Sequence, residues 1–200
     1  MFDSREPLGS LVDLTDWGYA YRKGILKPRK RRPIVVVVHT TGAGLWKRWQ
    51  HAPKRFDSPF DAALWVYCRT GMLNSGHLVV CGDTGRTARV VPDDVIARHV
   101  GSDHRAVYLG RQARMPQWWL ERYPNLESPA DLVGGDLWRF GVNAVGLGIE
   151  VSPRKAGPYL AWSSECVQRI REILRQWQLL YGPLTPLGHS EAAPLDRTSK

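Results

Sequence analysis

The strongest strand signal in the chain is the run of isoleucine and valine at residues 34–38, which follows Pro33. A continuous β-branched run without polar alternation is typical of a strand buried on both faces. Two shorter strands are predicted over residues 78–81 and 87–91, joined as a hairpin by the turn sequence Gly-Asp-Thr-Gly. The first run ends at His39, so a titratable side chain stands at the end of a buried strand.

Two helices are predicted from their caps and their hydrophobic spacing. Residues 58–70 open with Ser58 and Pro59, an N-cap followed by proline at the first helical position. Ser163 and Ser164 cap a second helix, which ends at Gly182-Pro183. Each helix has one apolar stripe. The stripe positions are Phe60, Ala63, Leu64 and Tyr67 in the first helix and Cys166, Ile170, Ile173, Leu174, Trp177 and Leu180 in the second.

Two later strands complete an alternation of strands and helices. Residues 145–151 predict a strand that carries Glu150, and residues 184–188 predict a short strand that delivers His189. Between the hairpin and these strands, Asp93-Asp94 starts a turn that leads to His99. We therefore expect an α/β fold, with a mixed β-sheet flanked by helices in a single domain.

The segment 110–140 combines aromatic residues with several prolines and glycines, which predicts a long loop with one short helix. The whole chain has nine tryptophans in 200 residues, more than a core of this size normally uses. We expect Trp118 and Trp119 to line a binding surface, although a hydrophobic cluster that packs the loop onto the sheet would use the same residues.

Residues 1–32 have weak periodicity and end in the basic run KPRKRR at residues 27–32. We interpret them as an N-terminal extension that precedes one globular domain over residues 33–200. The basic run is compatible with a patch for nucleic acid or nuclear import, or with a solvated flank. We favour the solvated flank, because no aromatic residue interleaves with the charges and a strand follows at once.

The composition indicates a globular protein without a membrane-spanning helix or a disulfide scaffold. Hydrophobic residues make up 43% of the chain and charged residues 24%, as in ordinary globular proteins. The longest apolar run is far shorter than the ~20 residues of a membrane helix, and charged residues near the N-terminus leave no secretory signal. Three widely spaced cysteines predict reduced core residues. The net charge of +9 predicts attraction to nucleic acid, acidic lipid or an anionic cell wall.

Three residues are candidates for chemistry by their position. His39 and His189 each follow a predicted strand, and open sheets place their sites at strand ends. A histidine there is more often a hydrogen-bonded structural residue than a ligand, and the wide spacing matches no short zinc signature. Glu150 either faces solvent or lies in a site where burial raises its pKa. Residue types alone leave these alternatives open.

Four separated segments of the chain resemble the motifs of one known family, and they occur in the order of those motifs. They span about four-fifths of the chain. They are VVVVHTTGAG at 35–44, SGHLVVCGDTGRTARVVPDDVIARHVG at 75–101, NAVGLGIEV at 143–151 and GHSEAAP at 188–194. Together they resemble the type 2 N-acetylmuramoyl-L-alanine amidases. That zinc family includes phage amidase endolysins, AmpD-type anhydromuropeptide amidases and peptidoglycan recognition proteins. Each match is weak alone, but the combination is specific.

The resemblance implies a mixed sheet flanked by helices and a Zn²⁺ ion bound by His39, His189 and a third Asp or Cys ligand. It also implies hydrolysis of the amide between the lactyl group of N-acetylmuramic acid and the first L-alanine of the stem peptide. Three ligands leave a fourth tetrahedral position for water, whose pKa the metal lowers towards ~7. Glu150 would be the general base, because Gly76 stands where some members have a tyrosine.

Two further histidines match family positions that are not zinc ligands. We therefore expect His77 and His99 in the wall of the site, as substrate-binding or hydrogen-bonding residues together with Trp118 and Trp119.

The chain departs from the family pattern after Pro194. The family continues A-P-G-R-K-x-D-P-G, where the lysine stabilises the oxyanion and the third ligand follows two residues later. This chain reads LDRTSK at 195–200. On the interpretation that we favour, Lys200 is the oxyanion lysine, the third ligand lies beyond it, and the domain is truncated at its C-terminal end. The competing interpretation assigns Asp196 as the ligand and Arg197 as the oxyanion cation.

These features predict a peptidoglycan amidase of the phage-lysin kind, with a non-catalytic peptidoglycan-binding or recognition module as the alternative. We expect a monomer with peptidoglycan and anionic wall polymers as partners, made in the cytoplasm and acting on the cell wall after release. Nucleic-acid binding is disfavoured, since no helix-turn-helix, zinc-finger or RNA-recognition pattern accompanies the basic run.

Overall fold

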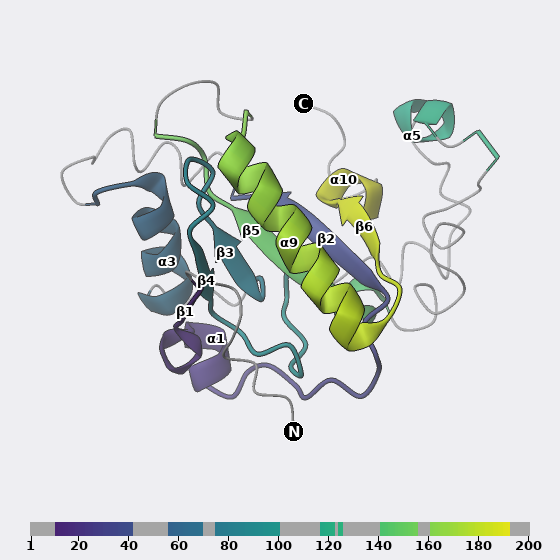
Figure 1. The fold of residues 1–200 in the computed structure, drawn as a ribbon. Coiled ribbons are helices and arrows are strands. Elements are labelled where there is room, and N and C mark those ends of the chain that lie inside the picture. Colours follow the sequence, from purple (N-terminus) through teal and green to yellow (C-terminus); the bar gives the residue numbers. More distant parts are fainter. Residues whose placement is uncertain are drawn as a thin grey trace.

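A computed structural model describes residues 11–41, 56–69, 75–100, 117–122, 124–125, 141–155 and 161–192. Its centre is a six-stranded sheet in the order β1-β4-β3-β5-β2-β6 (Figure 1). Every strand pair is parallel except β3–β4. The strands are β1 (Leu11–Asp13), β2 (Val35–Thr40), β3 (Leu78–Val80), β4 (Thr87–Arg89), β5 (Gly146–Val151) and β6 (Thr185–Gly188). The expected mixed α/β fold is confirmed.

Helices cover both faces of this sheet. The longest, α9, runs along one face, and α3 lies on the other side with the hairpin strands (Figure 1). None of the helices in the described part of the chain has the length and apolar character needed to cross a membrane. The helical segments are η1 (Thr15–Trp17), α1 (Tyr19–Arg22), α3 (Pro59–Arg69), α5 (Gln117–Arg122), α8 (Val142–Val145), α9 (Ser164–Tyr181) and α10 (His189–Ala192).

Local sequence signals place both long helices as expected. The Ser58 hydroxyl oxygen accepts a hydrogen bond from the Asp61 amide at 3.2 Å, which caps α3. The Ser163 hydroxyl oxygen accepts one from the Cys166 amide at 3.0 Å, which caps α9. Gly182 ends α9 with a φ of 79°, a conformation that glycine adopts without strain.

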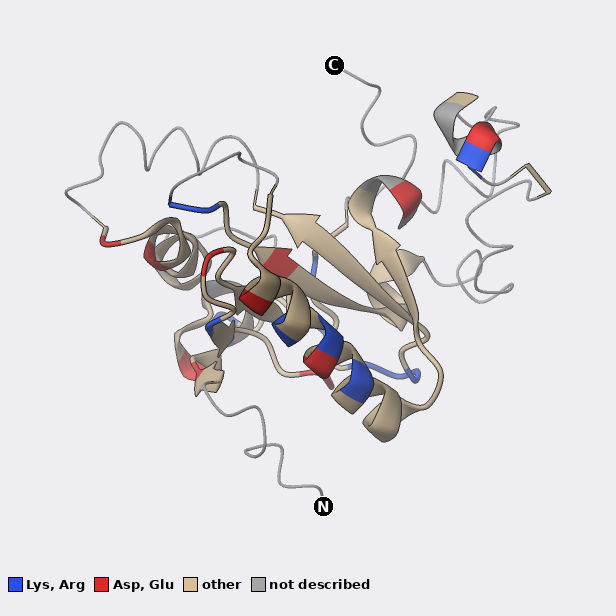
Figure 2. Cartoon of the chain, turned by 45° about the horizontal axis from the view of Figure 1, so that its top comes forward, with Lys and Arg blue, Asp and Glu red and all other residues tan. Residues whose placement is uncertain are grey.

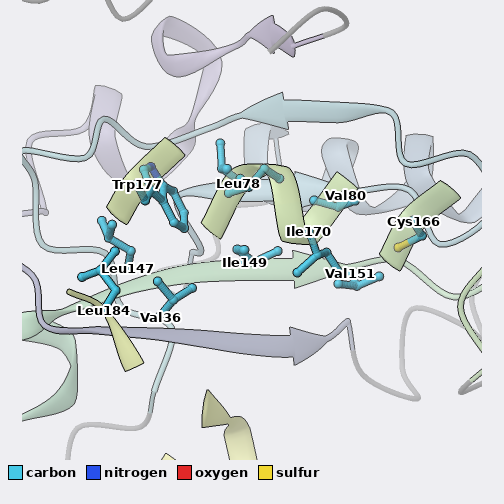
Figure 3. Close-up of a cluster of buried hydrophobic side chains, with 11 residues drawn as sticks. Val36, Leu78, Val80, Leu147, Ile149, Val151, Cys166, Ile170, Trp177 and Leu184 are labelled. Atoms are coloured by element: carbon cyan, nitrogen blue, oxygen red, sulfur yellow. The ribbon is translucent and has the colours of Figure 1, made fainter. Parts of the chain in front are cut away.

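One apolar cluster joins α9 to the sheet. Ile170, Ile173 and Trp177 pack onto Leu147 and Ile149 of β5 (Figure 3). Burial of each such side chain stabilises the fold by about 1.5–3 kcal/mol before entropy is counted. The predicted stripe is confirmed with one correction. Leu180 is 46% exposed, because it lies on the last turn of α9 and faces away from the sheet.

Part of the N-terminal segment is built into the sheet. Leu11–Asp13 pairs in parallel with β4, so the region before residue 33 supplies an edge strand that the weak periodicity did not predict. The basic run is also only partly a solvated flank. Lys30, Arg31 and Arg32 are exposed, whereas the Arg29 guanidinium is inserted between backbone carbonyls. Figure 2 shows the Lys and Arg positions of the described residues in blue, several of them along α9.

Candidate metal centre and active site

The candidate site lies at the carboxyl ends of three neighbouring parallel strands. His39 is the penultimate residue of β2 and pairs in register with Glu150 of β5. His189 follows β6 directly and begins α10. Because β5, β2 and β6 are adjacent and parallel, their carboxyl ends meet at one edge of the sheet. The topology thus brings together three residues that are far apart in the sequence.

His39 and His189 face one another through the same ring atom. Their Nδ1 atoms lie 2.7 Å apart, and the ring centroids lie 4.7 Å apart at an interplanar angle of 67°. His39 is buried and His189 is partly buried. Imidazole nitrogens are among the ligand atoms that a borderline metal such as zinc accepts, so these two rings are a candidate donor pair.

A second histidine fixes the orientation of His39. The Nε2 atom of His39 lies 3.1 Å from Nδ1 of His99. If His39 keeps its Nδ1 lone pair for a metal, its Nε2–H donates to His99, the usual arrangement behind a ligand histidine. Burial lowers the pKa of His99 well below its usual range, and nearby His77 adds to this, so His99 stays neutral and can accept.

Gly148 makes room for the His99 ring, and Asn143 holds the backbone of the loop that carries it. A Cβ atom on Gly148 would lie 2.6 Å from Cγ of His99, so only glycine fits at that strand position. The amide oxygen of Asn143 accepts hydrogen bonds from the backbone amides of His99 and Val100, at 3.2 and 3.0 Å. Its amide nitrogen donates to the Val100 carbonyl at 2.6 Å. Asn143 therefore ties α8 to the histidine loop.

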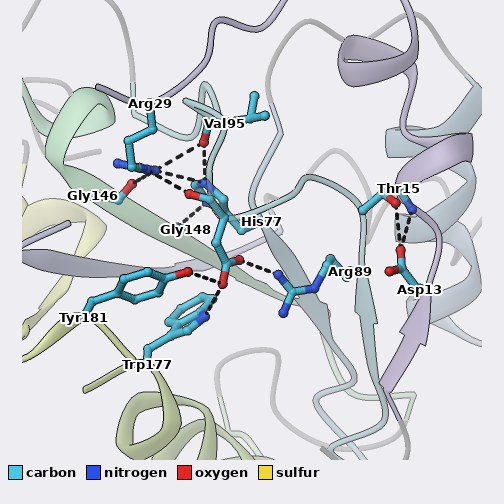
Figure 4. Close-up of polar contacts among 11 residues, drawn as sticks. Asp13, Thr15, Arg29, His77, Arg89, Val95, Gly146, Gly148, Trp177 and Tyr181 are labelled. Carbon is cyan, nitrogen blue, oxygen red and sulfur yellow. Dashed lines mark hydrogen bonds and ion pairs between the residues drawn. The ribbon is translucent and has the colours of Figure 1, made fainter. Parts of the chain in front are cut away.

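His77 is a structural member of the site wall. Its Nδ1 accepts a hydrogen bond from the Gly148 amide at 2.9 Å, so its Nε2–H donates to the Val95 carbonyl at 3.0 Å (Figure 4). Burial, followed by the charge of Arg29, lowers the pKa of His77 to about 3. Both ring nitrogens are used within the protein, which leaves His77 neutral and directs it to β5 and residue 95 rather than to a ligand.

Arg29 joins the segments around His77. Its guanidinium donates to the carbonyls of Asp93, Ala144 and Gly146, each at 2.9 Å, and to the Val95 carbonyl at 3.3 Å. These bonds connect the residue 93–95 turn to α8 and to the start of β5. Figure 4 shows the Arg29 bonds to Val95 and Gly146. Burial lowers the pKa of Arg29 from its usual value, partly offset by Asp93.

Glu150 is buried on the same side of the sheet as His39, with 7% of its surface exposed. The alternative of a solvent-facing carboxylate is therefore wrong. Burial, followed by the charge of Glu150, raises the pKa of Tyr67 of α3 well above its usual value. Gly76 lies against the aliphatic part of Glu150, since a Cβ atom there would be 2.8 Å from Cγ of Glu150.

The other predicted site residues are described only in part or not at all. Trp118 and Trp119 lie in α5, which confirms a short helix in the 110–140 segment, but their side chains are outside the description. Arg122 of the same helix forms a 2.9 Å ion pair with Glu191 of α10. Lys200, Asp196 and Arg197 lie outside the described residues. Among the residues that are described, no three His, Cys, Asp or Glu side chains are grouped to hold a metal.

Two residues that organise this site are not predicted from the sequence. The sequence predicts Arg29 only as part of a charge run. Asn143 begins one of the four segments, but no role follows from that position. The sequence signal for Arg29 was weak, because one arginine among six basic and proline positions is not distinguishable from its neighbours.

A solved structure shares this architecture. The chain matches "crystal structure of Se-Met AmpD derivative" with a TM-score of 0.54 and 18% identity, covering 100% of this chain and 92% of that one. It also matches the Ph2119 endolysin from Thermus scotoductus MAT2119 bacteriophage Ph2119 with a TM-score of 0.46 and 17% identity, covering 92% and 87%. No protein-family model and no curated protein matches the sequence. The comparison therefore establishes that this chain has the fold of AmpD.

Proposed function

We propose that this protein is a zinc-dependent N-acetylmuramoyl-L-alanine amidase, which hydrolyses the amide between N-acetylmuramic acid and L-alanine in peptidoglycan. The observation that carries the proposal is the convergence of the His39 and His189 Nδ1 atoms beside a buried Glu150 at one sheet edge. The AmpD-like fold and the four sequence segments agree with it.

The imidazole nitrogens of His39 and His189 are of the type that binds zinc. Neutral imidazole nitrogens are common zinc ligands, and His39 has the hydrogen-bonded partner on its far nitrogen that ligand histidines usually have. His39 and His189 would supply two protein ligands. The third would be Asp196 or a residue beyond Lys200, as the sequence resemblance implies. A zinc ion held there supplies a Lewis acid for the scissile carbonyl and lowers the pKa of water.

The protein's own groups supply the proton transfers. Glu150 takes a proton from the attacking water and passes it to the amine of L-alanine as the C–N bond breaks. Glu150 is only 7% exposed, so bulk water has little access to that proton. Lys200, or Arg197 on the competing assignment, would stabilise the negative charge that develops on the carbonyl oxygen.

The test combines metal content with product analysis. Purified protein is loaded with Zn²⁺, its zinc is measured by mass spectrometry, and it is incubated with purified peptidoglycan. The proposal predicts release of free amino groups on L-alanine by the zinc-loaded protein. Protein treated with a chelator should release none, and release should return when Zn²⁺ is restored. His104→Ala is a matched control, because this histidine lies in none of the four segments. Zinc binding and wall binding without amine release would instead support the non-catalytic recognition module.

A further inference from the structure

Glu191 of helix α10 connects two segments next to the candidate metal centre. One carboxylate oxygen, Oε2, accepts a hydrogen bond from the Gly188 amide at 2.7 Å. The other, Oε1, forms a 2.9 Å ion pair with Nε of Arg122 on helix α5. The proposed mechanism gives this side chain no role, although it lies two residues after His189. Each carboxylate oxygen thus contacts a different segment of the chain.

The bond to Gly188 closes the turn that carries His189. Gly188 ends β6 and His189 begins α10, so Glu191 is the third residue of the helix. A glutamate at that position commonly accepts from the amide just before the helix, as in one half of a capping box. From this closed turn, the His189 ring places its Nδ1 atom 2.7 Å from Nδ1 of His39. The Glu191 carboxylate therefore acts on the backbone that presents a candidate ligand.

The ion pair attaches helix α5 to the same turn. This helix carries Trp118 and Trp119, and Figure 1 shows it on the side of the molecule where α10 and the edge strand β6 lie. The Glu191 side chain is 15% exposed and that of Arg122 is 63% exposed. An ion pair with an exposed partner stabilises a whole fold only slightly, so we expect a local effect. The pair restrains where α5 lies relative to His189.

We propose that Glu191 is a positioning residue with two functions. Its Oε2 atom holds the turn of His189 in the geometry for metal binding, and its Oε1 atom holds helix α5 beside the candidate centre as a wall for the muropeptide. The inference rests on the proposed amidase function, which assigns His189 to zinc and the muropeptide to this edge of the sheet. Both functions can be measured on metal-free protein, without turnover.

Two substitutions of Glu191 separate these functions in a zinc titration of the metal-free protein. Glu191→Gln keeps an oxygen that can accept from the Gly188 amide but loses the charge, whereas Glu191→Ala loses both. The glutamine variant should therefore bind Zn²⁺ with wild-type affinity. The alanine variant should bind it about ten-fold more weakly, as is usual when a group that orients a ligand is removed. Arg122→Gln should bind Zn²⁺ like the wild type, because it leaves the turn intact.

Calorimetry with a soluble anionic muropeptide and metal-free protein tests the second function. Arg122→Gln and Glu191→Gln should each weaken binding about two- to five-fold, the range expected for one exposed ion pair. The double variant should bind no more weakly than either single variant, because both remove the same contact. If Arg122 instead bound the muropeptide directly, Glu191→Gln would free its charge and strengthen binding. That result would overturn the second function.

The matched control is Glu172→Ala, because Glu172 pairs with Arg169 at 3.1 Å within α9 rather than beside His189. This variant should keep both affinities, and melting curves verify that every variant is folded. Wild-type zinc affinity in Glu191→Ala would overturn the first function, and wild-type muropeptide affinity in Arg122→Gln would overturn the second.

The outcomes also distinguish this inference from the proposed function. If the wild type binds Zn²⁺ and the variants behave as expected, but no amine is released from peptidoglycan, the amidase proposal fails and the positioning role of Glu191 stands. If the wild type releases amine and Glu191→Ala keeps both affinities, the positioning role is wrong and the amidase proposal stands. A wild-type protein that binds no Zn²⁺ would overturn both.

Discussion

Along β5 the two faces of the sheet differ in chemistry, although one strand builds both. On the α9 face, Leu147, Ile149 and Val151 of β5 pack into a closed apolar cluster. On the other face, Gly148 lies against His99, and Glu150 lies against Gly76. Because successive strand residues point to opposite faces, one six-residue strand supplies both the core and the candidate site.

The two faces also satisfy burial differently. The α9 face stabilises the fold through area removed from water, and its main polar hub, Asp93, bonds Arg89, Trp177 and Tyr181 (Figure 4). The opposite face buries His39, His77, His99 and Glu150, with 4, 0, 7 and 7% of their surfaces exposed. Such a polar cluster stabilises a fold less than an apolar core, so we associate it with function. Substitutions should therefore separate stability from activity.

The largest effect is expected from the histidine pair. His39→Ala or His189→Ala should abolish zinc retention and amide hydrolysis, because a metal site depends on each ligand, while the thermal midpoint of the metal-free protein changes little. Zinc content by mass spectrometry, amine release and a melting curve measure the three quantities. Normal zinc content in either variant would remove that histidine from the ligand set.

Next in size is the loss of the general base. Glu150→Gln should keep zinc and lower kcat by ~10²–10⁴, because the amide has nearly the shape of the carboxylate but cannot take up the proton. Steady-state kinetics on a soluble muropeptide would measure the effect. Wild-type turnover in this variant would assign the base to another group or to bulk water.

A substitution on the α9 face should lower stability and leave activity unchanged, the reverse of the two substitutions above. Ile173→Ala removes a side chain that is 1% exposed and should lower the free energy of unfolding by about 2–5 kcal/mol through the cavity it leaves. Activity per folded molecule should stay at the wild-type level well below the midpoint. Denaturant unfolding and active-site titration test this, and a selective fall in kcat would show that the two faces are coupled.

Acid should destabilise the histidine face. The pKa of His77 is about 3 in the folded protein and 6.5 ordinarily, so the unfolded chain binds the extra proton between these values. Stability therefore falls as pH drops from about 6.5 towards 3, by about 1.4 kcal/mol per pH unit from this group alone. His77→Gln should remove that contribution from the slope of the unfolding free energy against pH, measured between roughly pH 6 and pH 4. An unchanged slope would assign the acid sensitivity to other groups.

The smallest expected effect concerns the tryptophan-rich segment. Trp118→Ala or Trp119→Ala should raise KM for cell wall a few-fold without shifting the thermal midpoint, if these rings stack on substrate. A lower midpoint with unchanged KM would assign them to a packed hydrophobic cluster instead.

Local sequence signals predict the elements and much of the candidate site. The Ile-Val run, the serine caps and the turn glycines predicted β2, α3, α9 and the hairpin, because each signal acts within a few residues. His39, Glu150 and His189 were also identified from strand ends and motif order.

Which of these residues meet depends on the packing of the folded domain. The parallel β5-β2-β6 order brings the two Nδ1 atoms to 2.7 Å, and no local pattern encodes that distance. Likewise, the sequence neighbours of Arg29 suggest a solvated charge run. Its role depends on what lies opposite the guanidinium after folding, namely four carbonyls from distant segments. Hydrogen bonds across the fold depend on packing of the whole domain, so they follow from tertiary contacts rather than from sequence periodicity.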